Sequence, residues 1–331
     1  MPDSRLNHAL ESGVVALPDA GTIAVLNPPE SFAPTALDPA RLKLEQGFFP
    51  AHAALARRGF DVAPEISGTF AAAVVFLPRA RDQARALVAR AVQLTGGGLV
   101  MVDGQKTDGI AGMLKALKGR VSLGGSFSKA HGKLAWFTGG DLSDWRAVER
   151  QVAGGFVTLP GVFSADAPDR GSQALAAALP ETLAGRGADL GAGWGFLARA
   201  ILAHPGVTHL DLIEADHTAL ACARRNITDP RAAFHWADAS QWGQGAGLDF
   251  VITNPPFHTS RAGAPELGRA FIRAAAGMLA PRGQLWLVAN RHLPYEATLA
   301  EHFRQVSETP GLPGFKLLHA QAPRPRARNL R

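Results

Sequence analysis

Short apolar runs alternate with longer amphipathic stretches through the second half of the chain. A short strand is predicted to lead into residues 191–195, and further apolar runs lie at 208–216, 233–239, 248–257 and 283–290. Between them, apolar residues recur at helical spacing, most clearly from about Glu266 to Leu279. Strands alternating with helical stretches of this length indicate βαβ units and a parallel sheet. Because such connections are right-handed, the sequence predicts an α/β fold with a doubly wound sheet.

The first half repeats part of this rhythm. Residues 70–104 are in the order strand, proline, helix, glycines, strand, which is also the order of residues 249–290. We interpret this as a tandem duplication, although any two α/β segments share some likeness at this level. A length of 331 residues also fits two domains, which we place at 1–150 and 151–331.

The first copy lacks the polar groups of the second. Where the second half has Asn254, the alignment places Leu77 in the first half, followed by Pro78, Arg79 and Arg81. The first half also has no glycine triplet comparable to that of residues 189–195. We therefore expect the N-terminal copy to be degenerate and inactive.

Composition narrows the class of protein. Hydrophobic residues make up 47% and charged residues 19%, which excludes a disordered or fibrous chain. No run approaches the roughly 20 apolar residues that cross a bilayer, and the N-terminus has no secretion signal. The single cysteine, Cys222, excludes an intrachain disulfide or a multi-cysteine metal site. We expect a soluble cytoplasmic protein with no membrane partner.

The charge is basic but evenly spread. The formal net charge is +6 and arginine far outnumbers lysine. A guanidinium suits bidentate contacts with phosphate, so this balance is compatible with a nucleic-acid partner without establishing one. The eleven histidines show no metal-binding spacing, and we expect no metal.

A glycine-rich turn at a strand-to-helix junction is the strongest local signal. Its spacing, D-x-G-x-G-x-G, differs from the G-x-G-x-x-G that holds a dinucleotide pyrophosphate. Glu214 ends the next strand, where a carboxylate can accept both ribose hydroxyls, and Asp238 is placed to meet an adenine edge or to cap a turn. Although glycines also serve plain tight turns, the combination favours S-adenosylmethionine as cofactor. The expected cofactor-binding residues are Asp189, Gly191, Gly193, Gly195, Glu214, Asp238 and Asn254.

A second motif follows the apolar strand at 250–253. Asn254, Pro255, Pro256 and Phe257 form a rigid polar turn at the sheet edge where open α/β folds bind ligands. The Asn254 oxygen and the Pro255 carbonyl can accept the N–H bonds of a planar amine, and Phe257 can stack on its ring. The motif therefore predicts methyl transfer to an exocyclic amine without a general base. Taken alone, the tripeptide indicates only a loop, and it also occurs at residues 27–29.

Together these motifs resemble class I S-adenosylmethionine-dependent methyltransferases, which have a Rossmann-like fold. Residues 158–173 (TLPGVFSADAPDRGSQ), NPPFH and residues 289–295 (ANRHLPY) resemble RsmC-type ribosomal RNA guanine-N2 methyltransferases. The resemblance implies a catalytic C-terminal domain, a degenerate N-terminal copy and ribosomal RNA or a ribosomal subunit as substrate, with the small subunit favoured. Trp194 within the glycine turn and the tail after Ala320 depart from the pattern.

Some roles remain open at this stage. His258 either lines the base pocket or caps the following segment. Arg79 and Arg81, with Lys106, Lys129 and Lys133, either contact RNA phosphates or are solvated surface charges. Other acceptors for the same motif are adenine N6 and protein glutamine. Different classes, a nucleotide-dependent oxidoreductase or a non-catalytic RNA-binding protein, are disfavoured by the glycine spacing and by the intact methyl-transfer motifs.

Overall fold

The structure is a computed structural model that describes residues 3–256, 265–309 and 313–325. The chain forms two compact units, each with its own core. The N-terminal unit contains Met1–Glu149 and Leu159–Gly161, and the C-terminal unit contains Arg150–Thr158 and Val162–Arg331.

The C-terminal unit is built on a seven-stranded sheet in the order β12-β11-β10-β13-β14-β16-β15. The first five of these strands pair in parallel, whereas β16 is antiparallel to both β14 and β15. A separate hairpin, β8–β9, precedes them. The strands are β8 (Arg150–Val152), β9 (Phe156–Thr158), β10 (Gly185–Leu190), β11 (Val207–Glu214), β12 (Ala232–Trp236), β13 (Leu248–Thr253), β14 (Leu279–Asn290), β15 (Phe303–Thr309) and β16 (Phe315–Pro323).

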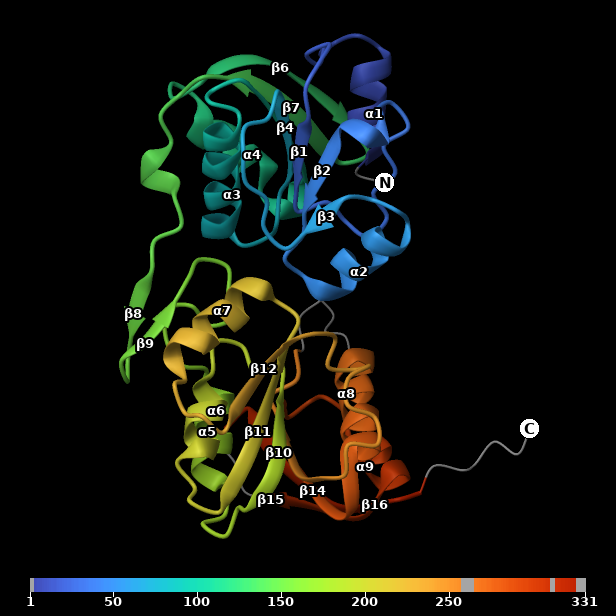
Figure 1. The fold of residues 1–331 in the computed structure, drawn as a ribbon, viewed down its shortest axis with the longest axis vertical. Coiled ribbons are helices and arrows are strands. Elements are labelled where there is room, and N and C mark those ends of the chain that lie inside the picture. The colour runs from blue at the N-terminus through green and yellow to red at the C-terminus, as the bar shows by residue number, and fades with distance from the viewer. Residues whose placement is uncertain (1–2, 257–264, 310–312, 326–331) are drawn as a thin grey trace, which may run out of the picture. The chain divides into compact units, whose positions relative to one another are not determined.

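Helices cover both faces of this sheet (Figure 1). Side chains of α5, α6 and α7 pack in one buried cluster with Phe250 and Ile252, while α8 and α9 pack against Val251 on the other face. In α8, Gly268, Phe271 and Ile272 are buried at helical spacing, which explains why the sequence predicted this helix. The helices are α5 (Arg170–Ala178), α6 (Phe196–Leu202), α7 (His217–Asn226), α8 (Pro265–Met278) and α9 (Glu296–His302).

The N-terminal unit repeats this topology. Its sheet has the order β3-β2-β1-β4-β5-β7-β6, which matches the C-terminal sheet strand for strand. The predicted fold class, two tandem doubly wound domains of which the first is degenerate, is confirmed. The elements are α1 (Asp3–Glu11), β1 (Ile23–Leu26), η1 (Pro39–Arg41), β2 (Leu42–Glu45), α2 (Phe49–Arg57), β3 (Val62–Ala63), β4 (Ala72–Phe76), α3 (Arg81–Leu94), β5 (Leu99–Gln105), η2 (Lys106–Asp108), α4 (Ile110–Leu117), β6 (Ser122–Lys129), β7 (Gly132–Thr138) and η3 (Ser143–Trp145).

The glycine turn of the C-terminal unit has a proline-rich counterpart in the N-terminal unit. Leu26 and Leu190 each end the first strand of their sheets, and each is followed by a left-handed residue, Asn27 (φ 55°) or Gly191 (φ 73°). Residues 27–29 therefore occupy the place of the glycine turn, not the place of the second NPP motif. Only the short helix η1 lies between β1 and β2, so this described stretch has no counterpart of α6.

The strand register also corrects one residue of the sequence alignment. Val75 pairs with Leu26 on β1, and Thr253 pairs with Leu190 on β10, so Val75 and Thr253 are equivalent. Phe76, and not Leu77, thus lies at the position of Asn254. The prediction of Leu77 was wrong by one residue because β4 and β13 read as similar apolar runs without an internal marker of register.

A buried ion pair ties α1 to the N-terminal sheet. The Arg5 guanidinium donates from Nε and Nη2 to the two carboxylate oxygens of Asp103, at 2.9 and 2.6 Å, and both side chains are almost fully buried. Gly132 leaves room for this arrangement, because a Cβ there would lie 2.5 Å from Arg5 Cζ. The pair fixes α1 over the antiparallel end of the sheet.

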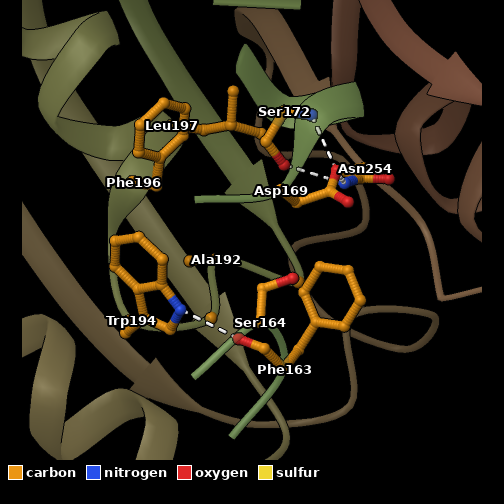
Figure 2. A pocket seen from close by; sticks show the side chains of 11 residues that line it. Phe163, Ser164, Asp169, Ser172, Ala192, Trp194, Phe196, Leu197 and Asn254 are labelled. Carbon is orange, nitrogen blue, oxygen red and sulfur yellow. Dashed lines mark hydrogen bonds between the residues drawn. The ribbon is translucent and has the colours of Figure 1, made fainter. Parts of the chain in front are cut away.

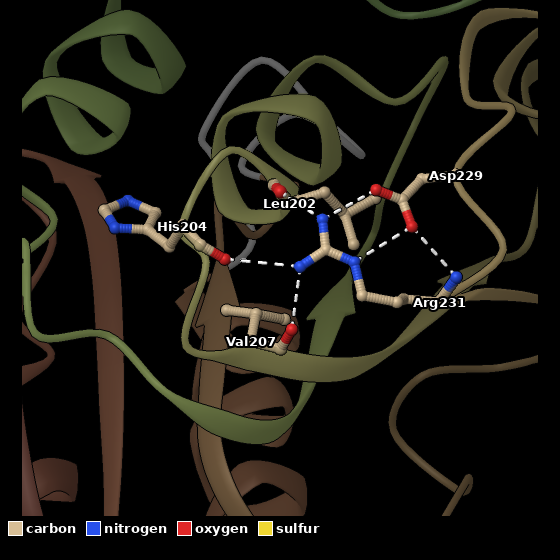
Figure 3. A network of polar contacts seen from close by, with 5 residues as sticks. All are labelled: Leu202, His204, Val207, Asp229 and Arg231. Carbon is tan, nitrogen blue, oxygen red and sulfur yellow. Dashed lines mark hydrogen bonds and ion pairs between the residues drawn. The ribbon is translucent and has the colours of Figure 1, made fainter.

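A second arginine, Arg231, bridges several chain segments at the edge of the C-terminal sheet where its parallel strands begin (Figure 3). Arg231 pairs with Asp229 and also donates to the carbonyls of Leu202, His204 and Val207. It thereby satisfies acceptors at the end of α6, where a cation is favoured, and connects that turn to the start of β12. The Arg231 side chain lowers the pKa of Asp229 to about 2.

Candidate functional site

The glycine turn follows β10 and opens α6. Gly191, Gly193 and Gly195 all have a positive φ, between 56° and 92°, which favours glycine over other residues. A Cβ at Gly193 would meet nothing within 4 Å, so the turn leaves open space on that side. Gly195 is instead a packing position, because its Cβ would approach Ile227 at 3.0 Å. The sequence-predicted loop is thus formed, with one glycine facing open space and one facing the core.

Glu214 ends β11 directly beside this turn. Its Oε2 accepts a hydrogen bond from the Gly193 N–H at 2.8 Å, and its Oε1 accepts from the Asp216 N–H at 2.8 Å. Each carboxylate oxygen has a further lone pair, so both remain able to accept from ligand hydroxyls. Burial raises the pKa of Glu214 to about 7, against the opposing effect of these two hydrogen bonds. A vicinal diol, as in a ribose, fits this carboxylate.

Asp189 is fully buried one residue before the end of β10. Neither of its carboxylate oxygens makes a hydrogen bond of normal geometry within the described chain. Burial, followed by the negative charge of Glu214, raises the pKa of Asp189 to about 8. A cationic ligand beside these two buried acidic groups would favour their ionised forms and lower both pKa values, and S-adenosylmethionine is such a ligand.

Asp238 follows β12 by two residues and is half-buried. Its Oδ1 accepts hydrogen bonds from the Ser240 N–H at 2.9 Å and the Ser240 hydroxyl at 2.6 Å. This is the turn-capping arrangement that the sequence left open. Oδ2 makes no hydrogen bond in the part of the chain described, so the cap leaves an acceptor for an exocyclic amine such as that of adenine.

Asn254 follows β13 and lines a pocket with the glycine turn (Figure 2). Its Nδ2 donates to Asp169 Oδ2 at 2.9 Å and to Ser172 Oγ at 2.8 Å. Its Oδ1 is buried and has no hydrogen-bond partner among the described residues. The two prolines that follow differ: Pro255 is buried and Pro256 is exposed. Phe257 and His258, which the sequence analysis included in the site, lie outside the described residues.

Sequence reasoning assigned no individual role to several residues of this pocket. Asp169 and Ser172 belong to the start of α5, and only the helix-capping function of an aspartate before an apolar helical pattern is readable from sequence. Phe163, 55% exposed, lies at the same pocket, and its carbonyl accepts from Trp194 Nε1 at 2.9 Å (Figure 2). Trp194 itself is buried against Phe156, which explains a tryptophan within the glycine turn.

The corresponding cleft of the N-terminal unit satisfies its own polar groups. Gln46, after β2, lies at the position of Glu214: its Nε2 donates to the Pro28 carbonyl at 2.7 Å and its Oε1 accepts from the Phe48 N–H at 2.8 Å. Asn27 Nδ2 donates to the Phe76 carbonyl at 2.9 Å. No acidic side chain replaces Glu214 there, and prolines replace the turn, which accounts for the degeneracy of this copy.

The remaining predicted residues lie on the surface of the N-terminal unit. Arg79 and Arg81 are exposed at the start of α3, and Lys106, Lys129 and Lys133 are exposed as well. Across the described residues, no group of three or more acidic, histidine or cysteine side chains is arranged to hold a metal ion. None of the described helices combines the length and apolar character needed to cross a membrane.

The parallel sheet with its antiparallel end, the glycine turn, and the carboxylate at the second strand end define a class I methyltransferase domain. In agreement, the methyltransferase small domain family matches residues 153–319. The chain is 30% identical to a ribosomal RNA small subunit methyltransferase C of Shewanella oneidensis, over 75% of this chain and 76% of that protein. This chain belongs to the methyltransferase small domain family.

Two further proteins extend the comparison. A ribosomal RNA large subunit methyltransferase G of Pseudomonas paraeruginosa is 38% identical over 48% of this chain and 44% of its own length. A solved structure of the 16S rRNA N2 guanine methyltransferase RsmC of T. thermophilus, in complex with S-adenosylmethionine and guanosine, has the same fold. Its TM-score is 0.79 at 24% identity, over 95% of this chain and 91% of that one. The prediction of an RsmC-type resemblance is confirmed, and the S-adenosylmethionine bound to the T. thermophilus enzyme is the cofactor that this sequence predicts.

Proposed function

We propose that the protein transfers the methyl group of S-adenosylmethionine to the exocyclic N2 of a guanine in ribosomal RNA. The observation that carries this proposal is the Oδ1 of Asn254, which is buried without a hydrogen-bond partner in the described part of the chain and lies in one pocket with the glycine turn. The small ribosomal subunit is favoured because the small-subunit relative aligns over 75% of the chain, whereas the large-subunit relative aligns over 48%. Such a substrate implies action in the cytoplasm.

The residues of the glycine turn would hold the cofactor. Glu214 would accept from the ribose hydroxyls and Asp238 from the adenine amine, while a cationic ligand nearby would favour the ionised form of Asp189, whose pKa burial raises to about 8. The bound cofactor supplies a methyl group already activated by a sulfonium. For that reason the chain needs no residue to activate a leaving group.

Asn254 and Pro255 would act on the acceptor. The lone pair of a guanine N2 is delocalised into the ring, so the amine is a poor nucleophile. Hydrogen bonds from its two N–H groups to the Asn254 Oδ1 and the Pro255 carbonyl orient the amine and direct its lone pair toward the methyl group. Phe257 would stack on the base, and His258 would line its pocket. The proton leaves after transfer, when the amine is acidic, without a dedicated base.

The N-terminal unit would position the RNA. Arg79 and Arg81 are exposed at the N-terminus of α3. A positive charge at this end of a helix interacts unfavourably with the helix dipole, so the two arginines do not stabilise the helix there. Charges in that place suit a phosphate ligand, which the same helix end attracts. Contacts of this kind orient an RNA without reading its sequence.

One experiment tests the reaction. The protein and labelled S-adenosylmethionine are incubated with each ribosomal RNA and each subunit from a strain without this activity, and the methylated nucleoside is mapped. We expect N2-methylguanosine in small-subunit RNA. Labelled N6-methyladenosine, or methylated glutamine in a ribosomal protein, would identify one of the other planar amines and refute the guanine assignment.

The Asn254→Ala variant tests the chemistry. We expect nearly unchanged cofactor affinity and a single-turnover rate lower by at least about 100-fold, because displacing a reacting atom by ~1 Å has an effect of that size. Calorimetry and rapid-quench methyl transfer measure the two quantities. A full rate in this variant would show that the NPPF motif is not the catalytic centre.

Charge removal at Arg79 and Arg81 tests the role of the N-terminal unit. The double alanine variant should bind RNA more weakly, with a shallower dependence of affinity on salt, and keep the single-turnover rate at saturating RNA. The matched control is Lys115→Ala with Lys118→Ala, which removes two exposed charges at the C-terminal end of α4 in the same unit. Normal RNA affinity of the arginine variant at every salt concentration would exclude this role.

A further inference from the structure

The hydrogen-bond partners of the Asn254 side-chain amide determine which of its two ends faces Asp169 and Ser172. Its Nδ2 lies 2.9 Å from Asp169 Oδ2 and 2.8 Å from Ser172 Oγ (Figure 2). A carboxylate can only accept hydrogen bonds, so the NH₂ group and not the oxygen must face Asp169. Both amide protons are thereby used on one side. The oxygen is directed to the other side, where it is buried without a partner among the described residues.

We propose that Asp169 and Ser172 are positioning residues, which hold the Asn254 oxygen as the acceptor for an N–H of the target amine. This inference rests on the proposed function and goes beyond it, because nothing in the NPPF motif itself determines which way its amide points. The two ends of an asparagine amide are almost isosteric. A rotated Asn254 would present an NH₂ donor to the donor groups of the amine, and would place its oxygen against a carboxylate.

Asp169 and Ser172 are themselves held in place by the first turn of α5. Asp169 is the N-cap of α5, and its Oδ2 accepts from the Ser172 backbone N–H at 2.8 Å as well as from Asn254. Ser172 is 7% exposed on the first turn of the same helix. One oxygen of Asp169 therefore connects the start of α5 to the residue that directly follows β13. The amide of Asn254 is oriented by an element that precedes the whole parallel sheet in sequence.

A helix cap is also a purely structural feature, so the variants must keep it. Asp169→Ser retains a good N-cap, but its hydroxyl is one atom shorter and falls short of Asn254. Ser172→Ala removes only the hydroxyl and keeps the backbone N–H that the cap binds. Ser172→Thr keeps the hydroxyl and serves as the conservative control, for which we expect a rate within twofold of wild type.

A double-mutant cycle separates positioning from structure. Single-turnover methyl transfer at saturating cofactor and RNA is measured for wild type, Asp169→Ser/Ser172→Ala, Asn254→Ala and the triple variant. We expect the double variant to be slower than wild type by at least about 10-fold, and the triple variant to equal Asn254→Ala within twofold. An equal slowing in both backgrounds, or a wild-type rate in the double variant, would overturn the proposal. If the double variant fails to fold, Ser172→Ala alone completes the same cycle with the same criterion of non-additivity.

A second measurement needs no RNA. Both side-chain amide protons of Asn254 should exchange slowly with solvent in the wild-type protein, and faster in Ser172→Ala but not in Ser172→Thr, as measured by NMR. Rapid exchange in the wild type would refute the anchoring itself. Because this result does not depend on the acceptor, it stands even if guanine proves to be the wrong substrate, so failure of the inference and failure of the proposed function are distinguishable.

Discussion

Replacing Glu214 gives the most direct test of the cofactor site. The carboxylate accepts from two backbone N–H groups, at 2.8 Å each, and in our proposal from the ribose hydroxyls. Glutamine has nearly the same shape but presents one acceptor and one donor. With Oε1 on the Asp216 N–H, its NH₂ would face the Gly193 N–H, and two donors would meet. We therefore expect Glu214→Gln to disturb the glycine turn almost as much as Glu214→Ala does.

The size of the effect follows from the bonds lost. A hydrogen bond to a charged group contributes about 1.5–3 kcal/mol, which corresponds to roughly a 10- to 150-fold weaker affinity for S-adenosylmethionine. Isothermal titration calorimetry measures this affinity, and thermal unfolding confirms that each variant is folded. The ligand-free variants should not be much less stable, because burial already disfavours the Glu214 carboxylate and raises its pKa to about 7. Unchanged affinity in a folded Glu214→Ala variant would remove Glu214 from the site.

Two further predictions concern stability. Asp189 has a pKa of about 8 and Glu214 a pKa of about 7, above their ordinary values of 3.8 and 4.5. The protonated forms therefore stabilise the folded protein. This stabilisation is complete below roughly pH 4 and is lost as the pH rises through 7 to 8. The unfolding temperature of the ligand-free protein should therefore fall between pH 5 and 9, less steeply in Asp189→Asn; parallel curves would contradict this. Asp103→Asn should destabilise the N-terminal unit by about 3–5 kcal/mol in urea unfolding, since the Arg5 charge stays buried without its counter-charge, whereas a loss below 1 kcal/mol would refute that account.

The parallel core of the fold was predictable because its signals are local. Buried parallel strands such as β13 are continuous apolar runs, and α8 carries its buried residues at helical spacing. The antiparallel strands β15 and β16 were not predicted. Five of the seven residues of β15 are exposed, so this edge strand has no apolar run to mark it. Its place is determined by pairing with β16, which is not a local property.

The same distinction holds for the site. Glu214 and Asn254 were found because each follows an apolar strand at the ligand-binding edge of the sheet. Asp169 and Ser172 were not assigned a role, since they lie more than 80 residues from Asn254 in sequence and meet it only in the folded chain. The position of Gln46 as the counterpart of Glu214 likewise required the strand register, because sequence alone gives no marker of equivalence there.

The two sheets of identical strand order also bear on how the chain folds. Consecutive copies of one topology can exchange strands during synthesis, a characteristic misassembly of repeat proteins. In this chain, β1 has four residues where β10 has six, and β3 has two where β12 has five. The turn at residues 27–29 is also stiffened by two prolines, whereas its counterpart is rich in glycine. Divergence of the first copy therefore discourages hybrid sheets and favours separate folding of the two halves, each on its own nucleus.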